Sequence, residues 1–236
     1  MDAGNVEVNL AGETVFQGKK ALKITFTARS SGTLVKMAGF RIDDYYEFLT
    51  DPETFCTYSV VRKERQGKRK RDIEIVYLPE TQQLHIKDVD VATSPPTTKK
   101  DRTVDQIPPC VQDALSALYS LRMKELGSGT RVRSLVGNND QVKEVESRVE
   151  KREPVETPSG KYDSWRLETF SLMGGLFKAN GQFKIWLTAD NRKMPVQFEA
   201  RVYLGKVTGK LAQFGTSEAS GLSGVDHKPN SVSPRR

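Results

Sequence analysis

The stretch Lys184–Gly205, KIWLTADNRKMPVQFEARVYLG, predicts two strands joined by a charged turn, and this pattern indicates the fold class. In its second half apolar residues alternate with polar ones, as in a strand with one buried and one solvated face. The apolar face consists of Val196, Phe198, Ala200, Val202 and Leu204. Trp186 falls on the polar face of the first strand. We expect it at the rim of the sheet with its indole N–H in water, the alternative being the wall of a binding groove.

The same alternation recurs along most of the chain and predicts further strands. The segments that carry it are residues 5–10, 21–28, 57–78, 83–92, 131–137 and 141–153. We therefore predict a mainly β protein, built as a curved antiparallel sheet in the shape of a half-barrel or open barrel. Residues 92–106, ATSPPTTKKDRTVDQ, are rich in proline, threonine and lysine, and we expect a long loop there.

One segment follows a helical period instead. Pro108 and Pro109 suit a helix start, where an amide hydrogen is not needed. After them the apolar residues follow helical spacing, and Gly127 suits the end of the helix. We predict one α-helix at about 109–124 whose apolar side packs on the sheet.

Length and composition predict a single antiparallel β domain over residues 1–211 and a disordered tail over residues 212–236. The formal net charge of +7 comes from 37 basic and 30 acidic side chains, so the charges are mixed. A single-strand nucleic-acid site would need aromatic residues interleaved along a basic face, and we do not expect nucleic acid as a partner. No run approaches the ~20 apolar residues of a membrane helix.

The chain offers few groups for chemistry. Cys56 and Cys110 are too few for a structural zinc site, and we expect two separate thiols, with a disulfide as the alternative in an oxidising compartment. His85 is expected as an exposed strand histidine, and Asp88 with Asp90 as a solvated strand face rather than a cation site. We predict no catalytic, cofactor-binding or metal-binding residues.

Three stretches in order, PPCVQDALSALYSLR, REPVETPSGKYDSWRLE and KIWLTADNRKMPVQFEARVYLGKVTGKL, resemble a bacterial family known as domain of unknown function 3108. The similarity spans roughly residues 6–211. It implies an extracytoplasmic, periplasmic protein that is mostly antiparallel β, with no known catalytic residues. Family members usually open with a secretion signal and another strand just before the position of Ala3-Gly4. The resemblance therefore implies a truncated start and a missing partner for the strand at residues 5–10.

We thus expect a non-enzymatic cell-envelope protein that binds a hydrophobic or lipid-like ligand, or an envelope protein, in or beside a curved sheet. The residues expected to line a groove are Trp186, Phe183, Phe198, Leu115 and Leu118. One alternative is a structural module that contacts envelope proteins or anionic polymers through a basic hairpin. Its residues are Arg62, Lys63, Arg65, Lys68, Arg69, Lys70 and Arg71, for which a solvated hairpin tip is the simpler explanation. A second alternative is an envelope hydrolase.

Overall fold

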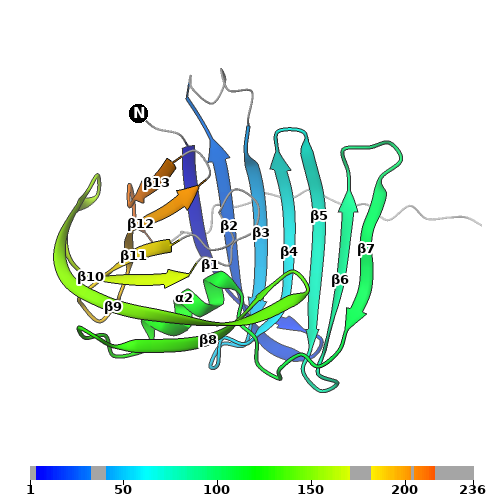
Figure 1. Ribbon diagram of the computed structural model, residues 1–236, viewed down its shortest axis with the longest axis horizontal. Helices are drawn as coiled ribbons and strands as arrows, with labels where there is room; N and C mark the ends of the chain where they lie inside the picture. Colours follow the sequence, from blue (N-terminus) through cyan, green and yellow to red (C-terminus); the bar gives the residue numbers. More distant parts are fainter. Residues whose placement is uncertain (1–3, 33–40, 171–181, 203–204, 216–236) are drawn as a thin grey trace, which may run out of the picture.

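Two antiparallel β-sheets hold an α-helix between them in the computed structural model (Figure 1). It describes residues 4–32, 41–170, 182–202 and 205–215. The expected signal and first strand, and the expected tail from residue 216 onward, lie outside these residues. Within them, no helix is long and apolar enough to cross a membrane.

The first sheet has seven strands, whose order in space follows the chain. They are β1 (Gly4–Phe16), β2 (Lys19–Ser30), β3 (Asp43–Thr50), β4 (Thr57–Gln66), β5 (Arg69–Leu78), β6 (Gln83–Asp90) and β7 (Thr97–Val104). Each strand pairs antiparallel with the next one along the chain, so the sheet is a meander with β1 at one edge. The second side of β1 has no strand partner among the described residues.

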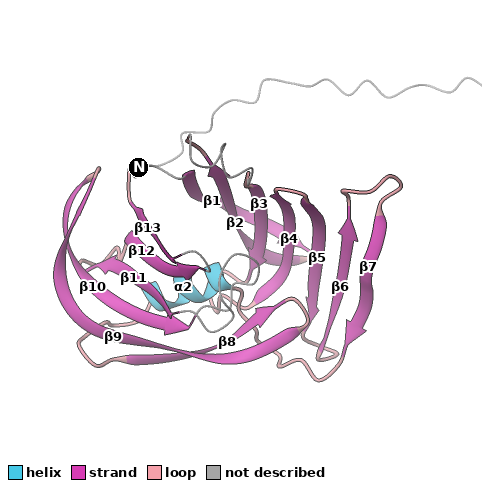
Figure 2. Ribbon diagram, turned by 45° about the horizontal axis from the view of Figure 1, so that its top comes forward, coloured by secondary structure: helices cyan, strands magenta, loops and turns pink. Residues whose placement is uncertain are grey.

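The second sheet has six strands and is also a meander. They are β8 (Arg131–Asn138), β9 (Gln141–Thr157), β10 (Gly160–Phe170), β11 (Gln182–Thr188), β12 (Pro195–Val202) and β13 (Gly205–Lys210). The long β9–β10 hairpin curves around the molecule, and the helix lies between the sheets (Figure 2). The prediction of a mainly β, curved antiparallel architecture is confirmed, with the strands divided between two sheets.

The expected loop at residues 92–106 is wrong, because it contains β7. Thr97 pairs with Asp90 and Val104 pairs with Leu84, so this polar segment forms the edge of the first sheet. Its threonines suit a strand, and the prolines stay outside it, where they remove no ladder hydrogen bond. An edge strand needs no continuous apolar face, which is why its composition resembled a loop.

The helix is shorter than predicted: α2 spans Ala114–Arg122. Gln112, inside the predicted helix, is extended instead and bridges to Val136 of β8, with its N–H donating to the Leu135 carbonyl at 2.8 Å. The helix starts only after Asp113, whose side chain accepts hydrogen bonds from the amides of Leu115 (2.8 Å) and Ser116 (3.0 Å). An aspartate N-cap therefore starts the helix, rather than the prolines.

The core lies on both sides of α2. Leu115 belongs to a cluster with the first sheet, and Leu121 to a cluster with the second sheet, while Leu118 contacts both clusters. We call the side of each sheet that faces α2 its inner face. A third, smaller cluster includes Trp186, Met194 and Val196.

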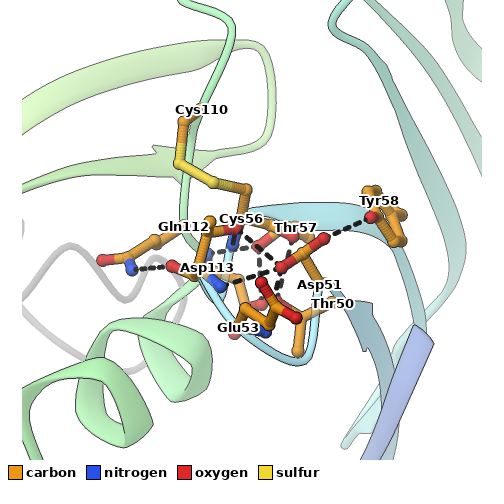
Figure 3. The surroundings of a disulfide bond; sticks show 10 residues. Thr50, Asp51, Glu53, Cys56, Thr57, Tyr58, Cys110, Gln112 and Asp113 are labelled. Atoms are coloured by element: carbon orange, nitrogen blue, oxygen red, sulfur yellow. Dashed lines mark hydrogen bonds between the residues drawn. A yellow bond between two sulfur atoms is a disulfide. The ribbon is translucent and has the colours of Figure 1, made fainter. Parts of the chain in front are cut away.

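A disulfide joins Cys56 to Cys110, which corrects the expectation of two separate thiols (Figure 3). The residues at the start of α2 bring the two cysteines together. Buried Asp113 accepts a hydrogen bond from the Thr57 hydroxyl at 2.9 Å, and its own amide donates to that hydroxyl at 2.7 Å. The carbonyl of Val111 accepts from the Thr57 amide at 2.7 Å. These bonds hold residues 110–113 against the start of β4, so Cys110 meets Cys56.

Reduction of this disulfide is expected to lower the free energy of unfolding by about 4 kcal/mol, because it closes a loop with a sequence separation of 54 residues. Urea denaturation of the oxidised protein with and without reductant measures the effect. The Cys56→Ser/Cys110→Ser double variant is the control and should not respond to reductant. Equal stability of the wild type in both conditions would contradict the prediction.

Candidate functional site

An apolar strip lies uncovered on the inner face of the first sheet. Val6, Val8 and Leu10 of β1 are 42%, 44% and 47% exposed. They pair directly with Ala28, Phe26 and Ile24 of β2. Directly opposed residues of antiparallel strands share a face, and Ile24 belongs to the core cluster beneath α2. The β1 side chains thus point toward the interior side of the sheet but lie beyond the part that α2 covers. We call Val6, Val8, Leu10, Phe26 and Ala28 the apolar strip.

Aromatic rings continue the strip across the sheet. Phe26 pairs with Tyr46 of β3, with ring centroids 5.4 Å apart, and Tyr46 lies 6.2 Å from Phe48 in an edge-on contact. Tyr46 is largely buried, and burial raises the pKa of its phenol well above the usual range. It therefore stays neutral and adds an apolar surface with a hydrogen-bonding end.

Beyond the core cluster, the inner face carries charged side chains from β4 onward. Tyr46 pairs with Arg62 of β4, whose guanidinium donates through Nη2 to the side-chain oxygen of Asn139. The buried Nε of Arg62 has no hydrogen-bond partner. Farther along, Arg69 binds Glu64 at 2.8 Å and Arg71 is paired with Asp88.

The turn between β8 and β9 contacts this charged region. Asn139 contacts Arg62, and the Asp140 carboxylate accepts from Lys100 at 2.7 Å and from Arg102. These two cations hold the pKa of Asp140 at about 2, below its usual 3.8. Val142 of β9 packs on the core cluster of the first sheet. Apart from the helix, this turn is a second contact between the two sheets.

Three of the seven cations of the basic hairpin are paired with carboxylates of their own sheet. Arg65 binds Asp72 at 2.6 Å, while Arg62, Arg69 and Arg71 lie on the inner face with the partners given above. The remaining cations Lys63, Lys68 and Lys70 are exposed, and Arg69 is exposed as well. The seven residues proposed as one electrostatic surface are thus divided between an internal network and a solvated tip.

The five residues predicted to line one groove are not brought together. Leu115 and Leu118 pack in the core around α2. Phe183 and Phe198 stack on each other on the inner face of the second sheet, 6.0 Å apart, and each is half-buried. Trp186 lies three residues after Phe183 along β11. Successive side chains of a strand point to opposite faces, so Trp186 points to the outer face.

The expectation that Trp186 is a rim residue in water is also wrong. It is only 6% exposed, and its Nε1–H donates to Glu153 Oε1 at 2.9 Å. Because the β9–β10 hairpin curves and the chain at Leu211 packs nearby, part of the outer face of the second sheet is also buried. Alternation alone could not show this second buried surface.

The candidate reactive side chains, a histidine, a cysteine and two aspartates, lie apart from one another or are already paired. His85 is a partly exposed strand histidine on the outer face, beside Thr103 (3.3 Å) and Asp101 (3.1 Å). Cys110 is in the disulfide. Asp88 and Asp90 do not form a solvated face, because Asp88 is paired with Arg71, and Asp90 accepts from the Ala92 amide at 3.0 Å.

The sequence did not show that Arg62, Tyr46 and the apolar strip form one surface. The alternation of residues 5–10 did mark Val6, Val8 and Leu10 as one face. Only the strand register shows that this face continues through Phe26 and Tyr46 to Arg62.

The comparisons with known proteins add a family and no activity. A family model described as "Protein of unknown function (DUF3108)" matches residues 1–212 of the chain, which confirms the resemblance seen in the sequence. No curated protein and no solved structure matches the chain.

The substitution Asp140→Asn is expected to lower the free energy of unfolding by about 1–2 kcal/mol at neutral pH. A carboxylate with a lowered folded-state pKa stabilises the fold above its unfolded pKa of 3.8, and this contribution is lost as the pH falls toward about 2. Urea denaturation of both proteins from neutral to acidic pH tests this. Glu144→Gln is the control, since Glu144 is an exposed carboxylate of the same hairpin. A difference that stays constant with pH would contradict the prediction.

The substitution Trp186→Phe is expected to lower the free energy of unfolding by about 1–2 kcal/mol, because it removes a buried hydrogen bond and part of the packing. Chemical denaturation followed by circular dichroism measures this. Unchanged stability would mean that the indole lies in water after all.

Proposed function

The chain belongs to the family described as a protein of unknown function, DUF3108, and since that membership brings no activity, we propose a function from the structure. The protein is a non-enzymatic cell-envelope protein that holds a hydrophobic or amphipathic, lipid-like molecule on the inner face of its first sheet. The apolar strip carries this proposal.

The strip supports ligand binding because its side chains point inward yet stay uncovered by the described residues. Val6, Val8 and Leu10 form three consecutive inward positions, each more than 40% exposed. A contiguous exposed apolar patch is typical of a ligand-binding groove or an interaction site. Phe26, which is only partly buried, extends the surface onto β2.

The second sheet also carries apolar side chains on its inner face. Phe183, Phe198 and Val207 lie on its inner face, and Val207 is 40% exposed. In both views β12 and β13 lie on the same side of the molecule as β1, the edge strand that carries most of the strip (Figures 1 and 2). A binding surface there would use Phe183 and Phe198 from the predicted groove, without Trp186.

The location in the cell envelope rests on the disulfide and the family resemblance. Disulfides persist in oxidising compartments such as the periplasm and are rare in the cytosol. The Cys56–Cys110 bond closes a long loop and anchors the helix, so it fits a protein that matures outside the cytoplasm.

The absence of catalysis is part of the proposal. A cysteine nucleophile needs a free thiolate and a nearby base. Cys110 is oxidised in the disulfide, and His85 lies on the outer face of the first sheet, beside Thr103. This arrangement argues against a cysteine hydrolase built on Cys110 and His85.

The alternative role as a contact module for anionic polymers has weaker support. Lys63, Lys68 and Lys70 of the basic hairpin present exposed cations, whereas Arg69 is exposed but bound to Glu64, and the other arginines contact partners within the protein. Exposed lysines on and near a hairpin turn are an ordinary solvated surface.

The test is native mass spectrometry of the full chain exported to a bacterial periplasm. We expect an additional mass that disappears after extraction with organic solvent. Val8→Asp should lose most of this mass, because it places a charge in the apolar strip. Asn9→Asp is the matched control, with the same new carboxylate on the opposite face of β1, and should retain it.

A bare wild-type mass, together with failure to take up an added long-chain amphiphile, would overturn the proposal. Equal retention of the ligand by Val8→Asp and Asn9→Asp would place the ligand away from the strip.

A further inference from the structure

A single cross-strand row joins the apolar strip to a cation. Val8 pairs with Phe26, Phe26 with Tyr46, and Tyr46 with Arg62, on four neighbouring strands. Neighbouring strands lie about 4.8 Å apart, so the row extends over about 14 Å, comparable to the length of a medium acyl chain. The row is apolar at β1, aromatic at β3 and cationic at β4.

Arg62 differs from the other cations of this inner face, because each of the others binds a carboxylate. Arg69 binds Glu64 at 2.8 Å, and Arg71 is paired with Asp88. Lys100 and Arg102 share the carboxylate of Asp140.

Arg62 contacts a neutral group instead. Its Nη2 donates to the side-chain oxygen of Asn139, and its buried Nε has no hydrogen-bond partner. A guanidinium is always protonated, and burying one of its donors without an acceptor costs free energy. Glu64, two residues away on the same face, is already bound by Arg69 at two nitrogens, 3.1 Å and 2.8 Å. Arg62 thus has a positive charge that no carboxylate among the described residues neutralises.

We propose that Arg62 binds the anionic head group of an amphiphile whose hydrocarbon chain lies along Tyr46, Phe26 and the apolar strip. The ligand class is a single-chain amphiphile with a carboxylate or phosphate head. This inference rests on the proposed function and specifies its ligand. The guanidinium supplies charge-assisted hydrogen bonds to the head group, and the neighbouring phenol of Tyr46 stays neutral beside it.

The competing explanation is that Arg62 only holds the β8–β9 turn through Asn139. The two roles differ in a measurable way. A structural contact would affect all ligands alike, whereas a head-group contact affects only anionic ones.

The experiment measures the dissociation constants of the delipidated full chain for dodecanoate, dodecyl phosphate and dodecanol by calorimetry. The three probes share one hydrocarbon chain and differ in the head group. The wild type is expected to bind an anionic probe at least about tenfold more tightly than dodecanol. The better of the two anionic probes identifies the head group as carboxylate or phosphate.

Arg62→Gln should lose this preference while binding dodecanol as the wild type does, and Arg62→Lys should keep most of it. Lys70→Gln removes an equal charge from an exposed position of the same hairpin and should change nothing. Asn139→Ala removes the contact to the turn but leaves the charge, and should retain the preference. If Arg62→Gln does not fold, Arg62→Met leaves no buried polar group and serves in its place.

Equal wild-type affinity for the anionic probes and dodecanol would overturn this inference and leave the proposed function standing. Loss of the preference in Asn139→Ala as large as in Arg62→Gln would also overturn it, because Arg62 would then act through the turn. Binding of none of the three probes would overturn the proposed function itself.

Discussion

The buried carboxylate of Asp113 is the interaction on which the rest of the structure depends. It caps α2 through the amides of Leu115 and Ser116, and at the same time accepts from Thr57 at the start of β4. One side chain thus fixes where the helix begins and to which strand it is attached. The Cys56–Cys110 disulfide secures the same junction covalently (Figure 3). With its start fixed, α2 directs Leu115 to the first sheet and Leu121 to the second.

The shortness of the helix has a consequence for the inner face of the first sheet. The nine residues of α2 pack on the core cluster of that face through Leu115, and Tyr119 stacks on Phe55 of the β3–β4 connection. Beyond them, the face is apolar on β1 and β2 and charged from β4 onward, where the β8–β9 turn contacts it through Asn139 and Asp140. The transition occurs at Tyr46 and Arg62, which are direct cross-strand partners. The candidate site therefore runs along the inner face from the uncovered apolar strip to Arg62, which the β8–β9 turn contacts through Asn139.

Much of the fold could be predicted because a half-buried strand has a period of two. Residues 5–10, 21–28 and 57–78 alternate, and all form strands of a meander. The prediction failed where tertiary contacts overrode the local pattern. Val111 and Gln112 fit a helical period, but hydrogen bonds to Thr57 and β8 keep them extended. Residues 97–104 carry no apolar face, because an edge strand does not need one.

The sequence by itself determined the strand-rich class, the presence of a helix after the prolines, and the family. The tertiary structure decided which residues meet. Trp186 became buried because a curved hairpin covers a face that alternation marks as solvated. The cysteines met because the helix cap places Cys110 beside β4. The apolar strip and Arg62 form one row because three strand registers align them, and register depends on pairing between strands, which no single strand's sequence contains.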